Sequence, residues 1–159
     1  MTDLILGVDP GLCGAFCLIN KDTRKIVDLW DMPINYRNGK NEIDIYTLGS
    51  KIDAHAKSIR FAVVEEVGVM TGQEGRVSMF NFGRNAGVIH GALGVLSIPV
   101  YFVKPAIWKS LMGVTRNKET SLAKASEIFP DEVKRWPLKK HDGRAEAALL
   151  AHFGVNRFK

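Results

Sequence analysis

Near its N-terminus the chain reads LILGVDPG, from Leu4 to Gly11. The apolar run at residues 4–8 is typical of a β-strand, and Asp9-Pro10-Gly11 ends that strand in a turn. An acidic group at the end of a strand is costly unless it is paired. Asp9 is therefore a candidate functional residue, provided that the fold supplies a partner for its charge.

Outward from this strand, the chain alternates between strand and helix patterns. Apolar runs at residues 15–19 and 25–30, with the polar turn 20–22 between them, predict strands in antiparallel hairpins. Residues 32–41, which contain Pro33, Asn38 and Gly39, are expected to form a loop. Further strands are expected at residues 61–64 and 99–103, and helices at 43–59 (capped by Asp44), 79–96, 105 onward, 118–129 (capped by Thr115 or Asn117) and 142–153, with Gly154 as a stop. This order indicates one α/β domain over residues 1–159.

The composition is that of an ordinary globular domain. The chain has 159 residues, of which 46% are hydrophobic and 25% charged, and this argues against disorder and coiled coil. No apolar run approaches the roughly 20 residues that span a bilayer, and the N-terminus lacks the basic segment of a secretory signal. Cys13 and Cys17 do not make a disulfide framework; their spacing places both on one strand face. We expect a protein of the bacterial or phage-infected host cytoplasm, without membrane contact.

Positive charge is concentrated in the C-terminal third. The formal net charge is +5. The segment from Lys104 to Arg144 contains ten Lys or Arg and five Asp or Glu, so it carries the whole excess and the rest of the chain is neutral. Clustered cations favour a polyanionic partner because they release counterions from a phosphate backbone. A solvated helical surface would give the same pattern, so charge alone leaves both interpretations open.

Three further carboxylates resemble Asp9 in their setting. Glu65 ends the apolar run at residues 61–64, and Asp142 and Glu146 lie four apart on a predicted helix, hence on one face. Each has a simpler explanation, as a turn, a strand end at solvent or a helix cap. Together, on a basic chain, they favour divalent metal ions, since Mg²⁺ prefers carboxylate and phosphate oxygens and paired ions can cleave a phosphodiester.

Four motifs carry a resemblance to a known family. They are LGVDPG at residues 6–11, VVEEV at 63–67, SMFNFGR at 78–84 and DGRAEA at 142–147, in this order and spacing. The chain resembles the RuvC-like Holliday junction resolvases, a branch of the RNase H-like nucleases, and is closest to the phage-type and organelle-type members, whose last motif ends in Glu. The resemblance covers nearly the whole chain, from Leu4 to about Phe153.

The resemblance implies an RNase H-like α/β fold, a mixed five-stranded sheet flanked by helices. Asp9 would lie on the first strand and Glu65 on the fourth, and Asp142 and Glu146 would project toward them from the last helix. These four residues would hold two Mg²⁺ ions, with Mn²⁺ as a substitute. The family nicks two strands of a four-way junction symmetrically and acts as a homodimer, which a two-fold substrate suits. The glycine-rich helix at residues 79–96 is the expected dimer contact.

The resemblance also indicates residues that meet DNA. Lys109 and Lys118 match lysines that assist catalysis, where a cation would stabilise charge on the scissile phosphate, although simple phosphate positioning would need them equally. The expected DNA contacts are Gln73, Arg76, Phe80, Arg84, Arg116, Lys139 and Lys140. Phe80 and Phe82 could instead be ordinary core aromatics.

Two features depart from some bacterial members. In those members the last motif has two aspartates three residues apart, whereas Asp142 and Glu146 are four residues apart. Those members also have an aromatic residue that touches the DNA crossover, and this chain has glycine at about that position, Gly68.

The leading hypothesis is a metal-dependent endodeoxyribonuclease that resolves four-way junctions. The alternatives are a non-catalytic branched-DNA binding module and an RNase H-like nuclease for RNA–DNA hybrids or flaps.

Overall fold

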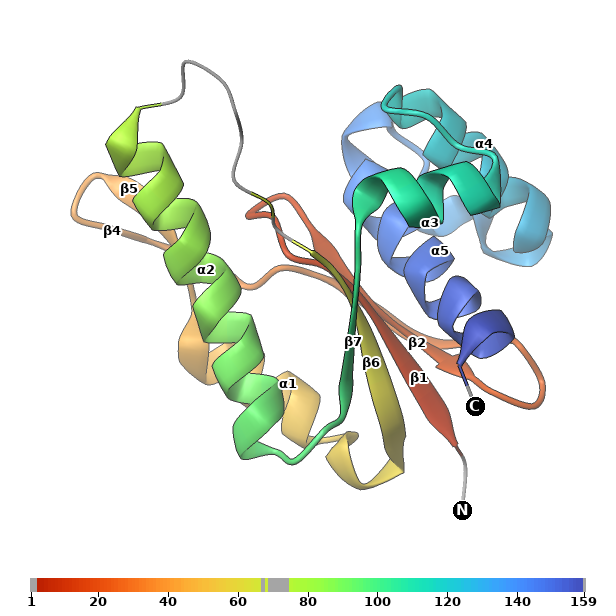
Figure 1. Cartoon of the computed structure of the whole chain (residues 1–159), viewed down its shortest axis with the longest axis horizontal. Helices are drawn as coiled ribbons and strands as arrows, with labels where there is room; N and C mark the ends of the chain where they lie inside the picture. The colour runs from red at the N-terminus through yellow and green to blue at the C-terminus, as the bar shows by residue number, and fades with distance from the viewer. Residues whose placement is uncertain (1–2, 67, 69–74, 159) are drawn as a thin grey trace.

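A computed structural model describes residues 3–66, 68 and 75–158, and it is built around a mixed sheet of five strands (Figure 1). The spatial order is β3-β2-β1-β6-β7. β1 runs antiparallel to β2 and parallel to β6, and β6 runs parallel to β7. The strands are β1 (Leu4–Asp9), β2 (Ala15–Asn20), β3 (Ile26–Asp31), β6 (Ile59–Glu65) and β7 (Val100–Val103). The predicted mixed five-stranded sheet is confirmed.

Helices cover both faces of this sheet (Figure 1). One face carries α5 (Asp142–Arg157) together with α3 (Pro105–Met112) and α4 (Lys118–Ile128), and the other carries α1 (Ile45–Asp53) and α2 (Arg76–Val95). Alternate residues of β1 accordingly enter different cores: Ile5 packs with the α5 side, and Leu4 and Leu6 with the α1 and α2 side. Burial on both faces explains why the first strand is a continuous apolar run.

Two glycines let α5 lie directly on the sheet. A Cβ built on Gly7 of β1 would stand 2.1 Å from the carbonyl oxygen of Ala147, and one built on Gly154 would stand 2.6 Å from Cγ2 of Val63. Gly154 was expected to end the last helix, but α5 continues to Arg157. The glycine therefore serves close packing rather than helix termination.

The segment predicted to be a loop at residues 32–41 is instead mostly a β-hairpin. β4 (Ile34–Arg37) pairs antiparallel with β5 (Lys40–Ile43). Asn38 and Gly39 connect them with φ angles of 52° and 78°. Positive φ at both positions is the conformation of the Asn-Gly hairpin turn, which matches the right-handed twist of the strands. The loop prediction was wrong because it treated these two residues only as helix and strand breakers.

Helix boundaries also differ from the expectation. The helix predicted over residues 43–59 ends at Asp53, a short 3₁₀ turn η1 (Ala56–Ser58) follows, and Ile59 already belongs to β6. Its predicted cap is confirmed, since the Asp44 carboxylate accepts hydrogen bonds from the backbone N–H groups of Tyr46 and Thr47. Asn117, rather than Thr115, caps α4.

The remaining connections are two further 3₁₀ segments, η2 (Pro130–Arg135) and η3 (Lys139–His141). Within the described ranges, no helix is long and apolar enough to cross a membrane. Cys13 and Cys17 do not share a strand face as predicted, because β2 begins only at Ala15; Cys13 is exposed and Cys17 is buried, and both are free thiols.

Candidate functional site

Asp9 is the centre of a group of four carboxylates. It ends β1, and its Oδ1 accepts a hydrogen bond from the backbone N–H of Gly11 at 3.2 Å. Burial, followed by the nearby charge of Glu146 and smaller effects of Glu65 and Asp142, raises the pKa of Asp9 to about 7, against the Gly11 hydrogen bond that lowers it. The fold thus brings together acidic residues from β1, β6 and α5 that are far apart in the sequence.

A glycine at the start of α5 allows this approach. A Cβ built on Gly143 would lie 2.4 Å from the carbonyl oxygen of Cys13 and 3.2 Å from Oδ2 of Asp9. The first turn of α5 therefore packs against the turn that follows β1. Asp142 and Glu146 flank this contact one helical turn apart, and Glu146 is buried, with 8% of its surface exposed.

Glu65 is held from a different element. The indole Nε1 of Trp108, on α3, donates a hydrogen bond to Oε2 of Glu65 at 2.7 Å. Burial raises the pKa of Glu65, and the Trp108 hydrogen bond partly offsets that rise. Trp108 is fully buried, and a buried indole N–H needs an acceptor. The sequence analysis missed Trp108, although its position directly before Lys109 was a usable signal.

The two predicted lysines lie against the carboxylates. Lys109 Nζ is 2.8 Å from Oε1 of Glu146, and Lys118 Nζ is 3.0 Å from Oδ2 of Asp142. The Asp142 carboxylate raises the pKa of Lys118. The buried hydroxyl of Ser121, a residue that sequence reasoning did not select, also donates to Oε1 of Glu146 at 2.9 Å. Each of these donors fixes a carboxylate that would otherwise be an uncompensated anion.

The donor set suits a hard divalent cation. Among residues 3–66, 68 and 75–158, no three His, Cys, Asp or Glu side chains lie close enough together to form a ready-made metal site. Burial, with a smaller contribution from the charges of the other three carboxylates, raises the pKa of Asp9. Carboxylate oxygens are the ligand type that Mg²⁺ and Mn²⁺ prefer. A cation here would supply the positive charge that the two lysines now provide in part.

A cavity of about 630 Å³ adjoins the carboxylates. Asp9 and Glu65 line it, and Lys104, Arg116 and Phe82 are also in its wall. Arg116 was a predicted DNA contact, whereas Lys104 was noted only as part of the basic segment. The cationic side chains in such a cavity can bind a phosphodiester and offset its negative charge close to the carboxylates.

The other predicted DNA contacts are placed as follows. Arg76 begins α2, and Phe80, one turn later, is 69% exposed, so the alternative that Phe80 belongs to the core is wrong. Arg84 is bound to Glu42 of the hairpin.

Two of the predicted contacts, Lys139 and Lys140, lie on η3, the segment that directly precedes Asp142. Lys139 forms an ion pair with Glu119 at 2.9 Å, next to Lys118, and Lys140 is exposed on η3. Gln73 lies outside the described residues. These lysines extend the basic surface of the site without entering the cavity wall.

Comparisons with known proteins agree with the fold. No family model and no curated protein matches the chain by sequence. RuvC from Thermus thermophilus superposes with a TM-score of 0.60 at 14% identity, over 96% of this chain and 95% of that one. The same organism's RuvC in complex with Holliday junction substrate gives 0.60 at 15%, over 98% and 96%. The yeast mitochondrial Holliday junction resolvase gives 0.58 at 14%, over 97% and 78%.

These similarities confirm, at the level of the fold, the resemblance drawn from the motifs. The chain has the α/β fold of the RuvC-like resolvases, and it covers nearly the full length of the bacterial structures. Identity this low carries no residue roles, so the function of the carboxylates depends on their own geometry.

The raised pKa of Asp9 predicts that the metal-free protein is destabilised by its own site. Because the pKa is about 7 in the folded chain against 3.8 ordinarily, the folded state loses stability as pH rises from about 4 through 7. Asp9→Asn should therefore raise the melting temperature in EDTA at pH 8 by a few degrees, and the gain should vanish near pH 4. Thermal unfolding across this pH range measures it.

Asp22→Asn is the matched control, since Asp22 is an exposed carboxylate in the turn after β2. It should change the melting temperature little at either pH. A lower melting temperature for Asp9→Asn at pH 8 would contradict a cost of burying the charged Asp9 carboxylate beside Glu146.

Proposed function

We propose that the chain is a divalent-metal-dependent endodeoxyribonuclease that resolves four-way DNA junctions and cuts related branched DNA. The observation that carries the proposal is the gathering of Asp9, Glu65, Asp142 and Glu146 beside a cavity with Lys104 and Arg116 in its wall. The RuvC-like fold supports it, because RuvC has been solved with a Holliday junction substrate. One nuclease domain over residues 1–159 would carry this activity.

The four carboxylates would hold two Mg²⁺ or Mn²⁺ ions. When bound, the ions activate a water and stabilise the leaving oxygen of a phosphodiester. Trp108 orients Glu65, and Ser121 and Lys109 orient Glu146, so neither carboxylate has to be ordered when the ions arrive. Such preorganisation lowers the entropic cost of assembling the site.

The lysines have a role once their carboxylates are neutralised by other charge. Lys109 and Lys118 then can donate to the non-bridging oxygens of the phosphate being cut, where negative charge develops. Lys104 and Arg116, which line the cavity together with Asp9 and Glu65, would hold the DNA backbone there. Arg76, Phe80, Lys139 and Lys140 extend the DNA-binding surface outward.

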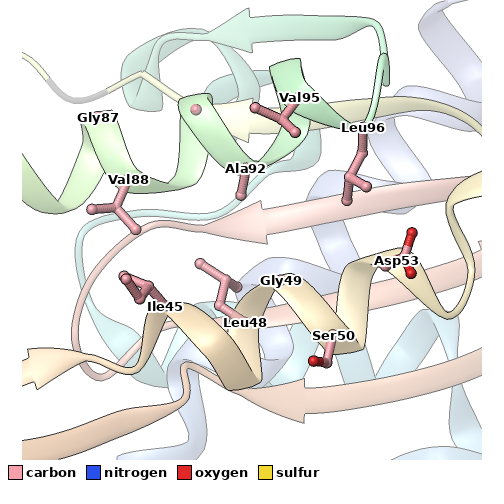
Figure 2. Close-up of a pocket in the computed structure, with 11 residues that line it drawn as sticks. Ile45, Leu48, Gly49, Ser50, Asp53, Gly87, Val88, Ala92, Val95 and Leu96 are labelled. Atoms are coloured by element: carbon pink, nitrogen blue, oxygen red, sulfur yellow. The ribbon is translucent and has the colours of Figure 1, made fainter.

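Two symmetric nicks require two sites, and we propose that a homodimer supplies them. A groove of about 550 Å³ lies between α1 and α2 (Figure 2). Ile45 and Leu48 point into it from α1, toward Val88 and Ala92 of α2. At Gly87 and Gly91 a Cβ would meet no described atom within 4 Å, so this face of α2 is open to a close helical neighbour.

Two other functions are less well supported. A branched-DNA binding module without activity would have no use for four clustered anions, because they repel the DNA phosphates. A nuclease for RNA–DNA hybrids or flaps would use the same carboxylates, and substrate competition separates it from a resolvase. A junction preference over flap, hybrid and linear duplex is the result that we expect.

Cleavage of an end-labelled four-way junction tests the proposed function. The wild-type chain should produce paired symmetric nicks in Mg²⁺ or Mn²⁺ and none in EDTA. Asp9→Asn should reduce cutting by at least about a hundredfold, or roughly 2.7 kcal/mol of transition-state stabilisation, because one of the four carboxylates loses its charge. Junction binding by the same variant should persist.

Asp22→Asn again serves as a control and should cut like wild type. Equal cutting by Asp9→Asn and wild type would refute the site assignment. Tight junction binding without cleavage in either metal would favour the binding module instead.

The proposed dimer contact can be tested at Val95, which ends α2 beside the groove and is 86% exposed. Val95→Glu should raise the dimer dissociation constant at least about tenfold, since burying a carboxylate in an apolar contact costs more than roughly 1.4 kcal/mol. Sedimentation equilibrium measures it. Val133→Glu, at an exposed valine on η2, should leave the dimer unchanged. A wild-type chain that stays monomeric at tens of micromolar would exclude this dimer.

A further inference from the structure

The hairpin β4–β5 projects from the same end of the sheet as the carboxylates. Asp9, Ala15 and Asp31 pair across β1, β2 and β3 in one row, and the hairpin begins three residues after Asp31. The backbone N–H of Met32, at its base, donates to the carbonyl of Gly14 in the turn that follows Asp9. The base of the hairpin therefore lies at the same edge of the sheet as Asp9.

Like charges face each other at the tip of the hairpin. Arg37 and Lys40 are direct cross-strand partners next to the Asn38-Gly39 turn, so their side chains leave the same face. Two cations directly opposite each other destabilise a strand pair. Asn35 and Glu42 are the next pair on that face, and Glu42 is 3.8 Å from Lys40.

A third cation reaches this face from α2. Arg84 lies 3.2 Å from the same Glu42 carboxylate, so a single anion pairs with both Arg84 and Lys40. Glu42 is the diagonal cross-strand neighbour of Arg37. These four side chains carry three positive charges and one negative charge, a local excess of +2. Figure 1 shows the hairpin beside the N-terminal half of α2. Two residues before Arg84, Phe82 lines the cavity at the carboxylates.

We propose that this hairpin face, formed by Arg37, Lys40 and Arg84, is a second DNA-contact site that holds the phosphate backbone of a duplex arm beside the strand being cut. The inference rests on the proposed function, because it takes a junction as the ligand. The opposed cations of Arg37 and Lys40 are costly in the free protein, and phosphates between them remove that cost while releasing counterions. The contact is independent of base sequence, because backbone phosphates carry no sequence information.

The test is the salt dependence of binding to a fluorescent four-way junction in EDTA, where nothing is cut. Arg37→Ala combined with Lys40→Ala should reduce the slope of log K against log salt by roughly 2, one for each lost phosphate contact, and raise Kd about tenfold at about 100 mM salt. Arg37→Lys keeps the charge and should keep the wild-type slope.

Lys25→Ala combined with Lys57→Ala is the matched control, because both lysines are exposed before β3 and β6, at the opposite end of the sheet. It removes the same charge and should leave Kd within twofold. Equal slopes for the hairpin variant and wild type would refute the second contact while leaving the proposed function intact. Weaker binding that accompanies loss of the dimer would refute a direct contact.

A wild-type chain that binds junction no better than linear duplex would overturn the proposed function itself, and the hairpin site with it. That outcome is read from wild type alone, so it cannot be confused with a failure of the hairpin variant.

Discussion

Close packing of α5 on β1 is the constraint on which the rest of the site depends. Gly7 leaves space for the backbone of α5 at Ala147, and Gly143 brings the first turn of the same helix against the turn after Asp9. Side chains at either position would force helix and strand apart. Because Asp142 and Glu146 belong to that first part of α5, their distance from Asp9 is set by backbone contact rather than by flexible side chains. The acidic cluster is thus built into the packing of the core.

Gathering four carboxylates costs stability, and the structure offsets the cost only in part. Lys109 and Ser121 bind Glu146, Lys118 binds Asp142, and Trp108 binds Glu65. Asp9 receives a backbone hydrogen bond from Gly11, yet its pKa remains near 7. Charge clusters that a fold tolerates but does not neutralise are typical of sites that bind a charged ligand. A divalent ion bound at this site would complete the charge balance that the neighbouring lysines begin.

The mixed sheet was predicted through the resemblance of the motifs to the RuvC-like resolvases. The four carboxylates were selected because strand-end and i,i+4 positions are local patterns, and their role as one site stays a prediction. Trp108 and Ser121 could not be assigned roles in this way, since each acts through a tertiary contact with a residue at least 25 positions away. Gly154 was misinterpreted because close packing and helix termination both favour glycine. The hairpin was missed even though Asn38-Gly39 is a strong turn signal, because its flanking residues are mostly polar and exposed. That Arg37 and Lys40 lie directly opposite each other follows only from the register of the two strands.

The central claim is that Asp9, Glu65, Asp142 and Glu146 form one divalent-metal site. Anomalous diffraction from crystals grown with millimolar Mn²⁺ tests it most directly, because it locates the metal without relying on activity. We expect Mn²⁺ peaks among these four carboxylates, with Asp9 as a ligand, and the loss of these peaks in Asp9→Asn. Well-ordered carboxylates without a peak, or Mn²⁺ bound only elsewhere on the chain, would contradict it.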